Sequence, residues 1–186
     1  MSPAAGRIVE AARTIAAERG LGALSVQAVA TAAGVHKSAI GYHFGNKEGL
    51  VLALIESLGH EESNEARRAV GRVAGPSERF HAYLSLYREL VMTSDHWRLA
   101  IALGPTPHYD EKTKVLGRSI ALDLGALHLR PEDAKARVLM SVLQAAITGL
   151  ALQYEARGSE MDLEACFARL EEALAPAFLR AMKDAG

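Results

Sequence analysis

Residues 25–44, SVQAVATAAGVHKSAIGYHF, decide the fold. The serine at the first position is a typical helix N-cap, and the apolar spacing after it predicts a short helix over residues 26–33. Gly34 tolerates the positive φ of a tight turn, and the apolar Val35 is placed to hold two helices together. A second helix is predicted over residues 37–43. Two short helices within about twenty residues have the size of a helix-turn-helix.

The second helix has two unlike sides. Ile40 and Phe44 give it an apolar side for packing. After it, Asn46 is expected to cap a further helix whose first turn carries Glu48, where the helix dipole favours an acid. The other side of the second helix is free to meet a groove and consists of His36, Lys37, Ser38, Gly41 and Tyr42.

The sequence around this motif resembles the N-terminal signature of the TetR family of bacterial one-component transcriptional regulators, which are usually repressors. The resemblance rests on Ala32-Ala33-Gly34-Val35 and on the run YHFGNKEGL over residues 42–50, and it covers about residues 7–55. It implies a DNA-binding head followed by a helical domain that binds an effector and forms dimers. Residues 1–50 are therefore predicted to form the head and residues 51–186 the second domain.

The resemblance and the side-chain chemistry together predict the DNA contacts. Hydroxyl and ammonium groups near helix N-termini suit phosphates, whereas Gln and Lys side chains suit the edges of adenine and guanine. Many relatives have a tyrosine where this chain has Gly41, so the contacts at that position differ from the family pattern. The predicted contacts are Ser25, Tyr42 and Lys47 for phosphates, Gln27, Lys37 and Ser38 for base edges, and His36 for either.

Composition narrows the class of protein. The 186 residues are 49% hydrophobic and 23% charged, which suits a folded core and excludes extended disorder. Residues 1–50 carry an excess of basic side chains within a nearly balanced total, as expected of a segment that meets an anion. Cys166 is the only cysteine, so no disulfide is expected and a reducing compartment is indicated. Without a signal peptide or a spanning segment, the chain is expected to be cytoplasmic, with no membrane partner.

Helical spacing recurs along the whole chain and strand-like alternation is scarce, so the predicted class is all-α. A helix over residues 3–19 completes a three-helix head. A long fourth helix, from about residue 47 to 73, is predicted to join this head to the C-terminal domain. The helices expected after it cover about residues 77–93, 95–103, 108–127, 132–154 and 161–183.

A single head touches few phosphates, so useful specificity calls for a two-fold dimer on a pseudo-palindromic DNA operator. The last two long helices are the expected dimer surface, as halves of a four-helix bundle with a second copy. Packing of these faces within one subunit is the alternative. The predicted interface residues are Met140, Leu143, Ile147, Leu150, Leu163, Phe167, Leu170 and Leu174.

The middle of the chain is expected to bind a small organic effector, because aromatic and methionine side chains with a few polar groups typically line such pockets. Ordinary core packing is the alternative for each of them. No cofactor and no metal is predicted, since His96, His108 and Asp110 match no metal-site spacing. The candidate pocket residues are Tyr83, Tyr87, Met92, Trp97, Tyr109, Gln144 and Tyr154.

Three other functions compete with this one. An enzyme is disfavoured because the sequence contains no P-loop, no GxGxxG after a strand, no HExxH and no GxSxG. A helical adaptor that has lost DNA binding conflicts with the basic and aromatic groups of Lys37, Tyr42 and Lys47. An activator of the same fold has the same sequence signature, so the choice between repressor and activator stays open.

Overall fold

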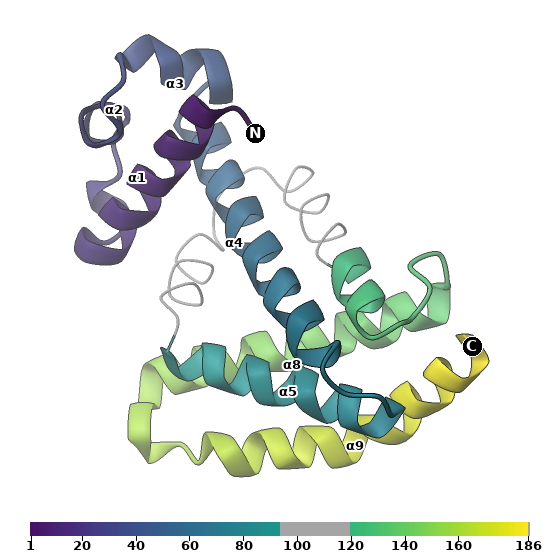
Figure 1. Ribbon diagram of the computed structural model, residues 1–186. Helices are drawn as coiled ribbons and strands as arrows, with labels where there is room; N and C mark the ends of the chain where they lie inside the picture. Colours follow the sequence, from purple (N-terminus) through teal and green to yellow (C-terminus); the bar gives the residue numbers. More distant parts are fainter. Residues whose placement is uncertain (94–119, 186) are drawn as a thin grey trace. The chain divides into compact units, whose positions relative to one another are not determined.

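The computed structural model describes residues 1–93 and 120–185 (Figure 1). Within these residues every regular element is a helix and no strand occurs, which confirms the predicted all-α class. The described chain divides into two compact units, and the division falls within one long helix. We call residues 1–59 the head and the described residues from 60 onward the C-terminal unit.

The head contains α1 (Pro3–Arg19), the short 3₁₀ helix η1 (Leu21–Ala23), α2 (Val26–Ala33), α3 (Lys37–Phe44) and the first half of α4 (Lys47–Val70). Ser2 caps α1, its hydroxyl accepting a hydrogen bond from the Ala5 amide at 3.2 Å. α1 packs against both α2 and α3. The buried core of the head is made by Ile8, Ala12, Ile15, Leu24, Val29, Ile40, Leu50, Leu54 and Leu58 together with smaller neighbours.

The first turns of α4 contribute to the core of the head. Leu54 and Leu58 follow Leu50 at helical spacing, and all three are buried in the core of the head. Each such burial contributes about 1.5–3 kcal/mol, so the first turns of α4 belong energetically to the head. The helix ends at Val70, slightly before the predicted end at residue 73.

The C-terminal unit contains the rest of α4, α5 (Pro76–Thr93), helical residues 120–126, α8 (Ala134–Arg157), η2 (Gly158–Glu160) and α9 (Leu163–Ala185). α5, α8 and α9 pack against one another. Phe80 of α5 stacks on Phe178 of α9 with ring centroids 4.6 Å apart, at the centre of the apolar core. The helix predicted over residues 95–103 lies outside the described residues, as does most of the one predicted over residues 108–127.

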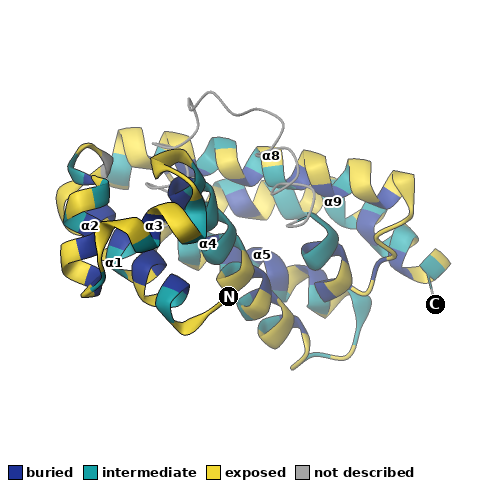
Figure 2. Cartoon of the chain, turned by 90° about the horizontal axis from the view of Figure 1, so that it is seen from above, coloured by how far each residue is buried: buried dark blue, intermediate teal, exposed yellow. Residues whose placement is uncertain are grey.

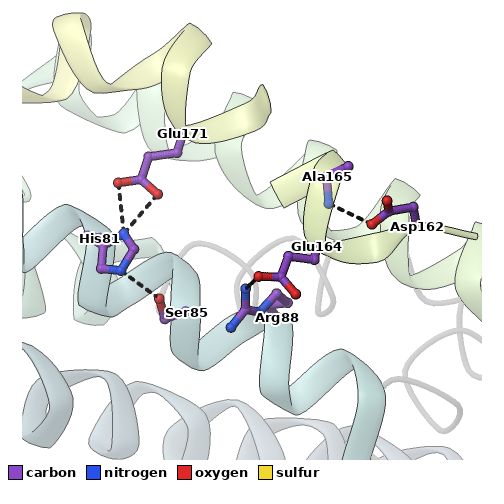
Figure 3. Close-up of polar contacts among 7 residues, drawn as sticks. All are labelled: His81, Ser85, Arg88, Asp162, Glu164, Ala165 and Glu171. Carbon is purple, nitrogen blue, oxygen red and sulfur yellow. Dashed lines mark hydrogen bonds and ion pairs between the residues drawn. The ribbon is translucent and has the colours of Figure 1, made fainter. Parts of the chain in front are cut away.

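Polar contacts hold the outer edges of α5 and α9 together (Figure 3). His81 lies 3.0 Å from both carboxylate oxygens of Glu171, and Arg88 pairs with Glu164 at 3.4 Å. One side chain of each pair, His81 or Glu164, is largely exposed, and ion pairs at the surface contribute only about 0–1 kcal/mol each. The apolar contacts beneath them therefore determine how α5 and α9 pack.

Candidate nucleic-acid interface and effector region

The turn between α2 and α3 has the geometry that its sequence predicts. Gly34 adopts the left-handed conformation, with φ 62° and ψ 39°, and ends α2. The amide of Val35 then donates to the carbonyl of Ala30 at 3.0 Å, which closes the end of the helix. Ile40, buried on the inner side of α3, fixes that helix against the rest of the head. The opposite side of α3 is consequently turned to solvent.

The residues predicted to contact DNA all lie on the surface of the head. Lys37, Ser38, Gly41 and Tyr42 share one face of α3, because positions four apart lie above one another on a helix. Tyr42 is 85% exposed, an unusual environment for a large aromatic side chain without a partner molecule. The exposed set consists of Ser25, Gln27, His36, Lys37, Ser38, Gly41, Tyr42 and Lys47.

His36 caps the N-terminus of α3. Its Nδ1 atom accepts a hydrogen bond from the Ser38 amide at 3.4 Å and lies 2.8 Å from the Ser38 hydroxyl. The two side chains therefore orient each other at the start of the exposed face of α3. Nε2 of His36 and the remaining hydrogen-bonding capacity of Ser38 stay available to a ligand.

Two other helix starts present groups that suit phosphate. The Ser25 hydroxyl accepts from the Ala28 amide at 3.1 Å, and the Asn46 side-chain oxygen accepts from the Gly49 amide at 2.8 Å. Lys47, exposed, is the first residue of α4. Partly unpaired amides, the positive end of the helix dipole and a lysine together attract an anion. The starts of α2 and α4 are thus suited to an anion.

The structure requires a glycine at position 49, and no sequence pattern marks this requirement. A Cβ atom at this position would lie 2.0 Å from the Phe44 carbonyl oxygen and 3.1 Å from the Phe44 carbonyl carbon. The first turn of α4 therefore passes directly against the backbone at the end of α3. Only glycine permits this approach, which fixes the position of Lys47 relative to α3.

The predicted effector residues are brought together only in part. Tyr83 and Tyr87 are buried with their rings 4.6 Å apart, while Gln144 and Tyr154 are half-buried. Met92 is 48% exposed at the end of α5 and does not join them. Trp97 and Tyr109 lie outside the described residues. The pair of tyrosines and Gln144 remain as the described part of the predicted pocket.

Asp123 is the centre of this group, and sequence reasoning missed it. Its buried carboxylate accepts hydrogen bonds from the Ser63 hydroxyl of α4 at 2.9 Å and from Gln144 Nε2 of α8 at 2.7 Å. The Tyr87 hydroxyl of α5 donates to it at 3.3 Å. We call Ser63, Tyr83, Tyr87, Asp123 and Gln144 the polar cluster. No local pattern marks it, because its members come from four separate segments.

Burial controls the ionisation of the polar cluster. Loss of water raises the pKa of Asp123, and the hydrogen bonds from Ser63, Gln144 and the tyrosines partly oppose this change. Burial and the nearby carboxylate also raise the pKa values of Tyr83 and Tyr87 well above 10.0, so both phenols are neutral at physiological pH. The cluster therefore combines a carboxylate that is costly to ionise with neutral hydroxyl donors.

Replacing Asp123 by asparagine is expected to flatten the pH dependence of stability in the C-terminal unit. A raised pKa in the folded state means that folding takes up a proton, so in the wild type this group favours folding in acid. The contribution is lost as the pH rises from the unfolded value near 3.8 through the higher folded value. The asparagine variant lacks this loss and should be within about 1 kcal/mol of the wild type at neutral pH. Its amide can donate to Gln144 Oε1, which has no hydrogen-bond partner among the described residues.

Urea unfolding from pH 4 to pH 8 measures this effect, with Asp184→Asn at an exposed aspartate as the matched control. The stability difference between the Asp123 variant and the wild type should move in favour of the variant as the pH rises. A difference that stays constant over this range would contradict the argument.

α8 has two apolar seams, and one of them packs within the C-terminal unit. The predicted residues Met140, Leu143 and Ile147 are buried within the C-terminal unit, as are Leu163 and Phe167 of α9. Leu150, Leu170 and Leu174 are half-buried against the same core. Figure 2 shows the buried positions of α8 on one side of the helix and exposed positions on the other. We call the second row of apolar positions the outer seam of α8. Its members are Val138, Val142, Ala145 and Leu152, which are exposed, and Gly149, which is half-buried.

Two features of the described residues bear on other functions. No group of three or more His, Cys, Asp or Glu side chains is placed to hold a metal ion there. The segment Ala134–Glu160 is long and apolar enough to cross a membrane by length and composition alone. Its apolar character arises from the two seams of α8, of which one packs into the core of the C-terminal unit.

Comparison with known proteins agrees with this geometry. Residues 8–54 match the family model of the bacterial regulatory proteins of the tetR family. No curated protein sequence gives a significant match. The family resemblance of the head is thereby confirmed.

Solved structures extend the likeness to the whole chain. A TetR-family transcriptional regulator from Streptomyces coelicolor is 24% identical with a TM-score of 0.69, covering 96% of this chain and 99% of its own. The fatty acid degradation regulator FadR from Bacillus halodurans is 17% identical with a TM-score of 0.69, covering 94% and 95%. FadR from Bacillus subtilis, solved with stearoyl-CoA, is 19% identical with a TM-score of 0.68, covering 91% and 96%. The chain therefore has the fold of TetR-family transcriptional regulators.

Proposed function

We propose that this TetR-type DNA-binding regulator is a repressor that binds a pseudo-palindromic operator as a homodimer and leaves it when a small molecule binds the C-terminal unit. The observation that carries the proposal is the exposed face of α3, flanked by the phosphate-suited starts of α2 and α4. Lys37 and Ser38 would read base edges, while Ser25, Tyr42 and Lys47 would bind the backbone.

A second copy is needed because one head offers few contacts. Two recognition helices must lie about 34–36 Å apart to enter successive major grooves. The outer seam of α8 supplies the surface for the second copy: Val138 and Val142 are 65% and 52% exposed, and Leu152 is 46% exposed. The seam repeats at intervals of four and three residues, as helices that pack in bundles do. A helix that is apolar on both sides is normally buried on both sides.

The polar cluster is the proposed anchor for the effector. Ser63 bonds to Asp123 and lies on α4, the helix whose first residue is Lys47. A ligand that replaces one of these hydrogen bonds would change the free energy of the present arrangement of α4. This change would shift the head between arrangements that bind DNA and arrangements that do not. Because the carboxylate of Asp123 is already costly to ionise, an uncharged or hydrogen-bond-donating part of the effector suits this place better than an anionic one.

Selection of sheared host genomic DNA by the purified ligand-free protein tests the proposal. We expect enrichment of one pseudo-palindrome at near-physiological salt. Lys47→Glu should weaken operator binding about 100-fold, because two heads each replace a phosphate contact with a repulsion. Lys183→Glu at an exposed lysine of α9 makes the same charge change outside the head and should leave binding unchanged.

Two results would count against the proposal. Retention of no specific sequence by a folded dimer would favour a protein that needs its ligand to bind DNA, or an adaptor without DNA function. Equal operator binding by Lys47→Glu and the wild type would show that the predicted face is not the one used. A reporter gene placed behind the recovered operator distinguishes repression from activation.

A further inference from the structure

Gly41 lies in the middle of α3, on the exposed face between Lys37 and Tyr42. Glycine weakens a helix relative to alanine, because it loses more conformational freedom on folding. Its presence in a helix of only eight residues therefore calls for a physical reason.

The fold of the head supplies no such reason. A Cβ atom at Gly41 would meet no other atom within 4 Å, and the residue does not have a positive φ. Gly34 and Gly45, in contrast, have positive φ values, and Gly49 meets the Phe44 backbone. Among these four glycines, Gly41 is thus the one at which packing within the subunit would tolerate a larger residue.

The missing side chain leaves a bare patch beside the predicted base-reading residues. On a helix, a side chain covers the surface over the turn that precedes its own Cα atom. A side chain at position 41 would therefore cover the surface next to Lys37 and Ser38, which lie four and three residues earlier. Without it, the backbone of α3 is open between these side chains and Tyr42, whose ring meets His43 edge-on with centroids 5.0 Å apart.

We propose that Gly41 is a specificity-determining residue: its bare backbone lets α3 lie close to the base edges, so that the short Ser38 side chain and Lys37 reach them. The inference rests on the proposed function. It assigns a role in DNA recognition to the absence of a side chain at Gly41. Close approach strengthens base contacts, which specify sequence, and it affects phosphate contacts at the helix starts much less.

Gly41→Ala tests this inference against Gly6→Ala. Gly6 lies in α1 of the same head, and a Cβ atom there also meets nothing within 4 Å. Both variants should keep or raise the melting temperature of the protein, since each improves a helix. Gly41→Ala should lose at least about tenfold in operator affinity while binding to unrelated DNA changes less than about twofold, and Gly41→Leu should lose more. Gly6→Ala should bind both DNAs as the wild type does.

Selection from a library with randomised half-sites gives a second readout. The Gly41→Ala variant should lose preference at one or two adjacent base pairs and keep it elsewhere. Operator affinity within about twofold of the wild type would overturn the inference, as would equal losses on operator and unrelated DNA. If the wild type selects no sequence at all, the proposed function fails first, and this inference fails with it.

Discussion

Gly49→Ala is expected to disrupt the junction between α3 and α4 and to abolish operator binding. The added Cβ atom would lie 2.0 Å from the carbonyl oxygen of Phe44, far inside any allowed contact. That oxygen belongs to the backbone, so no side-chain rotation relieves the clash. Either α4 moves away from α3, or the first turn of α4 unwinds.

Gly49→Ala should lower the free energy of unfolding of the head substantially. Forced overpacking typically costs about 1–3 kcal/mol, and a backbone clash of this depth stands at or above the upper end of that range. Displacement also breaks the cap at Asn46, whose side-chain oxygen accepts from the Gly49 amide at 2.8 Å, and this adds about 1 kcal/mol. Lys47, at the start of α4, would leave its place beside α3.

Thermal unfolding and operator affinity measure the two consequences of Gly49→Ala. Gly6→Ala is the stability control, since Gly6 lies in a helix of the same head and a Cβ atom there meets no other atom within 4 Å. The Gly49 variant should melt several degrees lower and lose operator binding even where it is folded. A melting temperature equal to that of the wild type, with full DNA binding, would show that α4 can move without cost.

The features that could be predicted from the sequence are those encoded locally. Ser25, Gly34 and Asn46 signal helix starts and a turn within a few residues of themselves, and the structure places each of them as expected. The exposed face of α3 follows from the same periodicity, because Ile40 fixes which side is buried. Local signals therefore determined the fold of the head and the surface that it presents.

The features that could not be predicted depend on contacts between distant segments. Asp123 gains its partners from residues 63, 87 and 144, and nothing near it in the sequence indicates that it is buried. Gly49 belongs to the quoted motif, but a steric demand between a helix start and a carbonyl of the preceding helix leaves no periodic pattern. Such constraints become visible only in three dimensions.

α8 shows a third reason why a feature of the structure could not be predicted from the sequence. Its apolar residues fill two opposite sides, so periodicity alone offers two equally good seams. One seam holds Met140, Leu143 and Ile147, the residues of α8 predicted at the dimer interface, and it is buried by α5, α9 and their neighbours in the C-terminal unit. Packing within the subunit buries this seam, and it leaves Val138, Val142 and Leu152 as the larger exposed side chains of the other one.

Val142→Asp is accordingly expected to convert the dimer into monomers and to remove operator binding. Val142 is 52% exposed in the single chain and lies at the middle of the outer seam of α8. In the subunit alone the aspartate would reach water, so stability of the fold should change by less than about 0.5 kcal/mol. In a two-fold interface each copy would bury an unpaired charge, which costs about 3–5 kcal/mol and weakens dimerisation at least 100-fold.

Thr148→Asp is the matched control, because Thr148 is exposed on the same helix and lies beside the outer seam rather than on it. Sedimentation velocity measures the oligomeric state, and fluorescence anisotropy measures the affinity for one operator. The Val142 variant should sediment as a monomer and bind a single half-site only weakly, since two linked heads bind far more tightly than one. A Val142→Asp protein that remains dimeric with full operator affinity would place the dimer interface on another face of the C-terminal unit.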